Sequence, residues 1–168
     1  MRPDIVPGAA FPDYELADHR GKHRTLSELQ GGDPLVLVLS RGGFCPKDRR
    51  QHEGLLQLHR EMEVSYCRLV TISTDNLLET NEFRSGVGAT WPFLSDPGRK
   101  LQKDLDIAEY TDPHHNPMIP HTLVLERSRS RRFVVRMTFR WRSGNRRCAV
   151  HASKSSRKHF TSVGSSRS

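Results

Sequence analysis

The stretch LVLVLSRGGFCPKD, residues 35–48, decides the fold class of this 168-residue chain. Residues 35–39 are an unbroken apolar run, whose length and β-branched side chains predict a strand buried on both faces, as in a parallel sheet. Residues 41–44 form a loop. A helix is then expected from Pro46 to about Glu63, because proline suits the first position of a helix. A buried strand that leads through a short loop into a helix predicts an α/β fold.

The alternation of strands and helices continues to residue 126. Residues 1–20 are expected to be extended, since their three prolines prevent a helix, and residues 25–29 to form a short helical turn. Strands alternating with helices imply β-α-β units. The remaining predicted elements are strands at 68–73 and 120–125 and helices at 76–86 and 98–106. The residues expected to pack the helices against the sheet are Leu55, Leu58, Met62, Leu77, Leu78 and Phe83.

The charge of the chain is divided unevenly. The net charge is +8, but residues 1–126 carry 14 Lys and Arg against 19 Asp and Glu, a net charge of −5. Residues 127–168 carry the other 13 Lys and Arg and no acidic residue. We therefore expect a mildly acidic domain at 1–126 and a basic, Arg/Ser-rich, largely disordered tail at 127–168. Within that tail, the partly alternating apolar pattern of residues 133–139 allows an edge strand.

Three interpretations of the tail stay open. It is a basic arm that binds nucleic acid by neutralising phosphates, a solvated tail, or the product of a shifted reading frame. We favour the shifted frame, because the pattern changes abruptly where the fold should continue with a strand pair and a closing helix. This interpretation leaves the C-terminal part of the fold incomplete, and a nucleic-acid partner is not expected.

Other features exclude several classes of protein. No stretch approaches the ~18 apolar residues of a membrane span, and the N-terminus lacks the basic and apolar regions of a signal peptide. Three cysteines are too few, and odd in number, for a secreted disulfide scaffold, so we expect no membrane partner and a cytoplasmic location. Neither Cys-x-x-Cys nor His-Glu-x-x-His occurs, and we expect no metal and no organic cofactor.

Cys45 is the candidate nucleophile. It lies between a buried strand and a helix, where the free backbone N–H groups and the helix dipole favour an anion. Arg41, Lys47, Arg49 and Arg50 add positive charge nearby, which favours the nucleophilic thiolate over the thiol. Reactive sites of open α/β sheets lie beyond the carboxyl ends of the strands, as this cysteine does. The alternative is a structural cysteine.

The chain resembles a known family. The segments PGAAFPDYEL (7–16), VTISTD (70–75) and PFLSDP (92–97) are similar, in order and spacing, to landmarks of the peroxiredoxins, the alkyl hydroperoxide reductase/thiol-specific antioxidant family. The resemblance covers roughly residues 5–126. It implies a thioredoxin-like, peroxiredoxin-type central sheet flanked by helices.

The resemblance also implies roles for residues. Cys45 would be the peroxidatic cysteine, whose thiolate attacks a peroxide O–O bond and becomes a sulfenic acid that another thiol reduces. Pro46 and the helix start would fix the thiolate, and Arg41 would support it electrostatically.

The sequence departs from the family at several positions. Gly42 and Val38 stand where the family usually carries Thr or Ser and Pro, and its characteristic later Arg is not evident. The segment around Pro120 and His121 instead looks like the thioredoxin loop in which a cis proline faces the active cysteine. His121 would orient substrate or support the thiolate, with a packing histidine as an equal alternative. Asp48 stands where a Cys-x-x-Cys motif has its second cysteine, so the chain looks intermediate between the two kinds of redoxin.

Two other cysteines are candidates to resolve a sulfenic acid. Cys67 follows the first long helix, and a helix of 18 residues spans about 27 Å, far beyond the reach of a disulfide to Cys45. We expect Cys67 to be a core residue. Cys148 in the tail is a weaker alternative to an external thiol.

The function that we expect is an antioxidant thiol peroxidase that reduces hydrogen peroxide or organic hydroperoxides. Its implied partners are the peroxide and an external reductant, either a thioredoxin-like protein or a low-molecular-weight thiol, and a homodimer stays open. The first alternative is a thioredoxin-like thiol–disulfide or redox-sensing protein with little peroxidase activity. The second is an inert redoxin fold with a nucleic-acid-binding tail.

Overall fold

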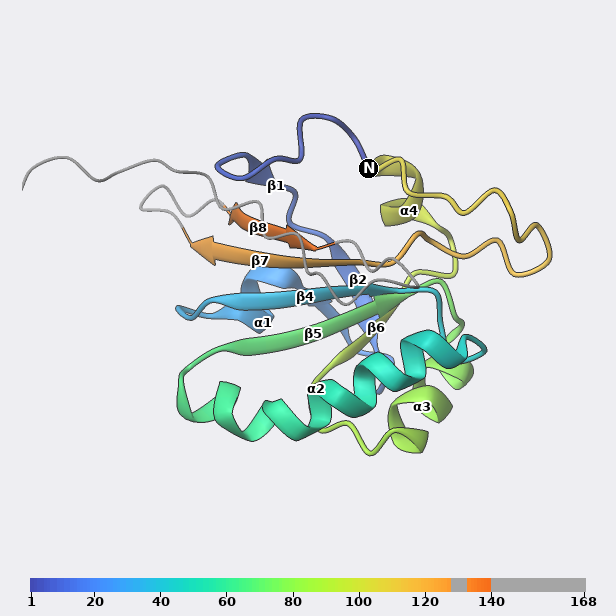
Figure 1. Ribbon diagram of the computed structural model, residues 1–168, viewed down its shortest axis with the longest axis horizontal. Helices are drawn as coiled ribbons and strands as arrows, with labels where there is room; N and C mark the ends of the chain where they lie inside the picture. Colours follow the sequence, from blue (N-terminus) through green and yellow to red (C-terminus); the bar gives the residue numbers. More distant parts are fainter. Residues whose placement is uncertain (128–132, 140–168) are drawn as a thin grey trace, which may run out of the picture.

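In the computed structural model, which describes residues 1–127 and 133–139, a mixed sheet of eight strands forms the centre of the molecule (Figure 1). Its strand order is β1-β8-β7-β4-β5-β6-β2-β3. The strands are β1 (Ala10–Phe11), β2 (Glu15–Asp18), β3 (His23–Thr25), β4 (Leu35–Ser40), β5 (Arg68–Ser73), β6 (Phe93–Ser95), β7 (His121–Arg127) and β8 (Phe133–Phe139). The helices are α1 (Leu26–Gln30), α2 (Pro46–Val64), α3 (Leu77–Gly86) and α4 (Lys100–Asp104).

The middle of the sheet confirms the predicted buried strands. Strand β4 pairs in parallel with β5, with Leu37 opposite Val70, and β5 pairs in parallel with β6. On its other side β4 pairs antiparallel with β7, with Leu37 opposite Leu123. The carboxyl ends of β4 and β5 therefore lie at the same edge of the sheet. The loop that leads to α2 leaves from this edge.

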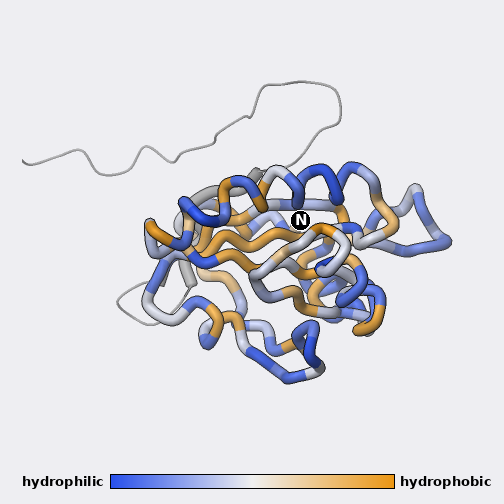
Figure 2. The backbone as a smooth tube through the Cα atoms, turned by 90° about the horizontal axis from the view of Figure 1, so that it is seen from below, coloured by the Kyte–Doolittle hydropathy of each residue, from blue (hydrophilic) through white to orange (hydrophobic). Residues whose placement is uncertain are grey.

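Two hydrophobic clusters lie on opposite faces of the sheet. Leu35, Leu37 and Leu39 belong to one cluster, together with residues of the N-terminal segment, α1 and α4. Val38 belongs to the other, which includes Phe83 of α3 and has residues of α2 packed against it. Figure 1 shows α2 and α3 on one side of the sheet, and Figure 2 shows that the hydrophobic segments concentrate in the central strands. The two-sided burial of β4 explains its unbroken apolar run.

The predicted start of α2 is confirmed, but its predicted apolar face is partly wrong. Leu58 is 52% exposed. The residues that face the sheet are instead the buried Asp48, His52 and His59, with the partly buried Leu55 and Met62 beside them at helical spacing. Polar members of this stripe are buried because they form hydrogen bonds, which a search for apolar residues does not detect.

In helix α3, too, the buried face differs from the predicted one. Asn76 caps the helix, and its side chain and that of Glu79 form a capping box. This start turns Thr80 and Phe83 toward the sheet and leaves Leu77 and Leu78 exposed, so the prediction that these two leucines are core contacts is wrong. Helix α4 is shorter than the predicted 98–106.

The strand expected at residues 133–139 is present as β8, but it is not an edge strand. It pairs antiparallel with β7 on one side and with β1 on the other, where Phe11 is opposite Phe133. The N-terminal segment supplies this outer strand, a long-range pairing that local patterns do not reveal. The domain boundary after Glu126 and the nature of the tail stay predictions, since most of the tail lies outside the described residues.

Within the described part of the chain, every helix is too short or too polar to cross a membrane.

Candidate active site

Cys45 lies at the N-terminus of α2, as the sequence predicts. It is the N-cap residue, its side chain makes no capping hydrogen bond, and Pro46 occupies the first turn of the helix. The residue is 7% exposed and lines a pocket of about 510 Å³. The sulfur therefore lies close to the unpaired N–H groups and the positive end of the dipole of a 19-residue helix, which stabilise a negative charge.

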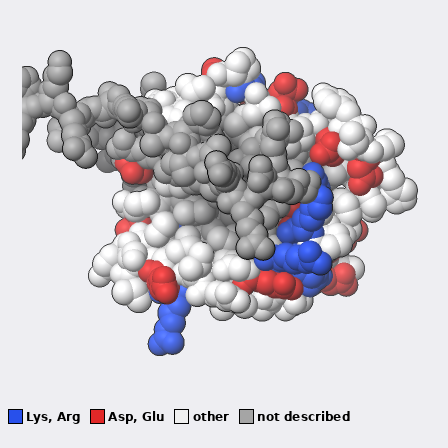
Figure 3. All heavy atoms as spheres, viewed as in Figure 1, with Lys and Arg blue, Asp and Glu red and all other residues white. Residues whose placement is uncertain are grey.

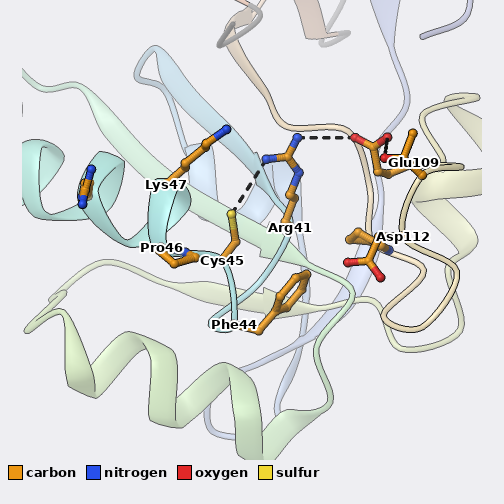
Figure 4. Close-up of a pocket in the computed structure, with 10 residues that line it drawn as sticks. Arg41, Phe44, Cys45, Pro46, Lys47, Glu109 and Asp112 are labelled. Atoms are coloured by element: carbon orange, nitrogen blue, oxygen red, sulfur yellow. Dashed lines mark hydrogen bonds and ion pairs between the residues drawn. The ribbon is translucent and has the colours of Figure 1, made fainter. Parts of the chain in front are cut away.

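Arg41 supports the sulfur from the end of β4. Its Nη1 lies 3.8 Å from Sγ of Cys45, and its Nη2 lies 3.4 Å from Oε2 of Glu109 (Figure 4). A hydrogen bond from the Thr111 hydroxyl, together with the Arg41 guanidinium, lowers the pKa of Glu109. Glu109 thus stays ionised and holds the guanidinium beside the sulfur. The predicted electrostatic role of Arg41 is consistent with this position.

Asp48 is a site residue whose role was not predicted from the sequence. The Cys45 thiol donates to its Oδ1 at 3.6 Å, while Oδ2 accepts from the Ser40 hydroxyl at 3.0 Å and from the Arg41 backbone N–H at 2.5 Å. The Asp48 residue is 3% exposed. Its carboxylate therefore joins the end of β4 to the start of α2 around the cysteine. The Cys-Pro-Lys-Asp spacing, which places Asp48 one turn along the helix from Cys45, is the signal that points to it.

Gly42 explains one departure from the family pattern. Its φ is +121°, and a Cβ at this position would lie 2.2 Å from Oδ1 of Asp75. The same carboxylate accepts a hydrogen bond from the Gly43 N–H at 2.9 Å. Asp75 follows β5, and burial raises the pKa of its carboxyl, with the hydrogen bond from Gly43 opposing this effect. A Thr or Ser does not fit where Asp75 holds the loop so closely.

A second segment forms the opposite wall of the pocket. Residues 109–117, between α4 and β7, contribute Glu109, Asp112 and Pro117, and Ala108 bridges Met118 at the base of this loop. Residues 109–117 contact the loop at residues 41–44 through a stack of the His115 ring on the Phe44 ring. The ring centroids are 3.9 Å apart and the ring planes differ by 4°. No strong local pattern marks this segment, so the sequence alone does not predict its place in the site.

The predictions for Pro120 and His121 are wrong in part. All peptide bonds of the described residues are trans, including the one before Pro120, and Pro117 lines the pocket instead of Pro120. His121 is paired with Leu39 in the sheet, its Nδ1 lies 2.9 Å from the Ile119 carbonyl, and it is not among the pocket residues. Because β7 begins at His121, strand pairing fixes this segment and leaves the facing wall to the preceding loop.

Cys67 lies at the far end of α2 from Cys45, as predicted. The 19 residues of α2 span about 28 Å, so these two thiols are too far apart for a disulfide. The prediction that Cys67 is a core residue is wrong, because it is partly exposed just before β5. Cys148 lies outside the described residues.

The charged groups of the site do not form a metal site. Among residues 1–127 and 133–139, no three His, Cys, Asp or Glu side chains come together as a ligand set.

Comparison with known proteins identifies the family. The model of the AhpC/TSA family matches residues 7–130. The chain is 23% identical over 125 residues to the 1-Cys peroxiredoxin PER1 of Hordeum vulgare, covering 70% of this chain and 57% of the relative, and 24% identical over 100 residues to the chloroplastic peroxiredoxin Q of Oryza sativa, covering 60% and 46%. It thus spans about half the length of these curated relatives.

Solved structures agree with the fold. Peroxidoxin BcpB of Mycobacterium tuberculosis superposes with a TM-score of 0.70 at 22% identity, covering 81% of this chain and 86% of that one. PrxQ of Xylella fastidiosa superposes with a TM-score of 0.63 at 20% identity, covering 77% and 83%. The predicted peroxiredoxin-type fold is therefore confirmed. Because the family model matches well over half of its residues, the chain belongs to the AhpC/TSA family.

Proposed function

We propose that this protein is a thiol peroxidase that reduces hydrogen peroxide or an organic hydroperoxide at Cys45. The observation that carries the proposal is the position of this cysteine, which lies at a helix N-terminus with the Arg41 guanidinium 3.8 Å from its sulfur, in an open pocket. Membership of the AhpC/TSA family, and relatives named as peroxiredoxins, support the same chemistry.

In the first step the Cys45 thiolate attacks the terminal oxygen of ROOH. The S–O bond forms as the O–O bond breaks, RO⁻ leaves and takes a proton to become ROH, and Cys45 is oxidised to the sulfenic acid. Arg41 and the start of α2 stabilise the thiolate and the charge that develops on the oxygens. Asp48 holds the resting thiol and joins Ser40 and the Arg41 backbone to α2, which fixes the direction of the sulfur.

In the second step an external thiol returns the cysteine to its starting state. A first thiol RʹSH attacks the sulfenic sulfur, giving a mixed disulfide and water, and a second RʹSH releases Cys45 as the thiol with RʹSSRʹ as product. Cys67 is separated from Cys45 by the length of α2, which argues for a reductant from solution, either a thioredoxin-like protein or a low-molecular-weight thiol. The alternative function, that of a thioredoxin-like thiol–disulfide oxidoreductase, is disfavoured. Asp48 occupies the position of the second cysteine in the Cys-x-x-Cys motif of such proteins.

The compartment and assembly state are part of this proposal. We propose a cytoplasmic location, because the cycle consumes reduced thiols and the sparse cysteines suit a reducing compartment. Cell fractionation tests the location, and sedimentation of the purified chain tests whether it forms a homodimer.

The test of the proposal is peroxide consumption with dithiothreitol as the reductant. Cys45→Ser is expected to abolish catalysed consumption of hydrogen peroxide and of cumene hydroperoxide, while Cys67→Ser retains it. Cys148→Ser is expected to retain it as well, since the reductant comes from solution. Unchanged consumption by a folded Cys45→Ser variant would refute the proposal, and loss of turnover in Cys148→Ser would replace the external thiol with an internal one.

A further inference from the structure

Two cations at the edge of the Cys45 pocket have no partner among the residues that the structure describes. Lys47 and Arg50 both line the pocket, and their spacing of three residues places them on the same side of α2. Both are exposed, and neither forms an ion pair or a side-chain hydrogen bond in the described part of the chain. Figure 3 shows Lys and Arg side chains gathered over the end of the molecule where α2 begins. A free ligand in the pocket therefore meets two positive charges that are available for binding.

The other charged side chains of the pocket already have partners within the protein. Arg41 pairs with Glu109, which also accepts a hydrogen bond from Thr111. Asp112 accepts the backbone N–H of His115 and lies 3.0 Å from its Nδ1. Figure 4 shows the Lys47 side chain on the same side of the pocket as the Arg41 guanidinium. Three cations, Arg41, Lys47 and Arg50, line the pocket against the two carboxylates of Glu109 and Asp112, so its charged side chains sum to +1 and the two unpaired cations favour an anionic group on the ligand.

The rest of the pocket suits the apolar part of a small organic ligand. Phe44, which is 41% exposed, Pro46 and Pro117 contribute apolar side chains to its lining. The volume of about 510 Å³ is within the usual range for a small organic ligand. At 1.5 Å per residue, Lys47 and Arg50 follow Cys45 by about 3 and 7.5 Å along α2. A ligand that reacts at the sulfur thus reaches these cations if its anionic group lies about 5 Å, the length of one helical turn, from its reactive atom.

We propose that Lys47 and Arg50 are specificity-determining residues that bind the carboxylate of an organic hydroperoxide, so that the protein prefers carboxylate-bearing hydroperoxides to neutral ones. The inference rests on the peroxidase function proposed above. The chemistry at sulfur is unchanged: the terminal peroxide oxygen passes to Cys45, the alkoxide leaves as the alcohol, and the carboxylate only anchors the substrate.

A matched pair of substrates tests the inference in the oxidation step alone. Reduced full-length protein is mixed with cumene hydroperoxide or with its para-carboxylate, and the rate of Cys45 oxidation is followed by rapid quenching and mass spectrometry. We expect the carboxylate to react roughly five to ten times faster at low salt, with the advantage shrinking as salt screens the charges. A rate ratio near one at low salt would overturn the inference.

Variants assign the preference to the two cations. The ratio of carboxylate to neutral rate is expected to fall toward one in the double variant Lys47→Gln/Arg50→Gln, and to keep its wild-type value in Arg60→Gln, which removes an exposed charge farther along α2. Using the ratio cancels any general change in the reactivity of the sulfur. A preference that survives the double variant would overturn the assignment. Failure of both hydroperoxides and of hydrogen peroxide to oxidise Cys45 would instead refute the proposed function itself.

Discussion

The sulfur of Cys45 and the carboxylate of Asp48 lie 3.6 Å apart, one helical turn from each other at the start of α2. The Arg41 guanidinium lies 3.8 Å from the same sulfur. A cation stabilises the thiolate, whereas an adjacent carboxylate opposes it. The reactivity of Cys45 therefore depends on two neighbours that act in opposite directions.

Substitution of these two neighbours is expected to change the alkylation rate of Cys45 in opposite senses. Asp48→Asn removes the negative charge and should speed the reaction with iodoacetamide at pH 7 roughly fivefold, while Arg41→Gln should slow it roughly tenfold. The rates are measured by mass spectrometry of the modified peptide. Asp33→Asn and Arg60→Gln serve as controls, because they remove one negative and one positive charge at positions outside the pocket. If Asp48→Asn and Arg41→Gln shift the rate in the same direction, this electrostatic account is wrong.

A side chain at position 42 is expected to destabilise the protein. Gly42→Ala introduces a Cβ into a backbone with φ of +121° and against the Asp75 carboxylate, so we expect a loss of about 3 kcal/mol or more in the free energy of unfolding. Urea denaturation followed by circular dichroism measures it. Gly32→Ala is the control, since Gly32 has open space around its Cβ position. Equal stability of the two variants would contradict the role assigned to Asp75.

His52 is expected to make stability depend on pH. It is fully buried, its Nδ1 donates to the Asp48 carbonyl at 2.7 Å, and its Nε2 accepts from the Thr71 hydroxyl, which itself accepts from Trp91 Nε1. Burial lowers the pKa of His52 below its ordinary value of 6.5, against an opposing effect of Asp48. The stability that neutral His52 contributes is therefore complete above pH 6.5 and is lost as the pH falls below it.

The variant His52→Asn tests this dependence. At pH 7 it should be less stable than the wild type by about 2–4 kcal/mol, since a cavity forms and Thr71 loses a partner. Between pH 7 and pH 5 the wild type should lose more stability than the variant, so that the difference between their free energies of unfolding narrows. Gly32→Ala, which changes no titratable group, should show a difference that stays constant. A constant difference for His52→Asn would argue against a buried neutral histidine.

The sequence was most informative where one local pattern determined one element. The apolar runs predicted β4 and β5, and Pro46 predicted the start of α2, because these signals depend only on neighbouring residues. The predicted faces of the helices were less accurate. In α2 the buried stripe contains His52, whose burial depends on hydrogen bonds to residues that are distant in the sequence.

The same distinction applies to the site. Cys45 and Arg41 were predicted from their positions around a strand-to-helix corner. The contributions of Asp75 and Glu109 depend on contacts between segments 32 and 68 residues apart, and no local pattern reports them. Pro120 was misassigned because a short likeness to the thioredoxin loop outweighed the strand that begins at His121.

The most direct test of the account is the intact mass of the reduced protein after exposure to dilute hydrogen peroxide with a sulfenic-acid trap present. The account predicts one trap adduct, which peptide mapping places on Cys45, and no adduct on Cys67. The Cys45→Ser variant should give no adduct under the same conditions. Folded wild-type protein that gains no adduct at Cys45 would contradict the central claim that this thiol reacts with peroxide.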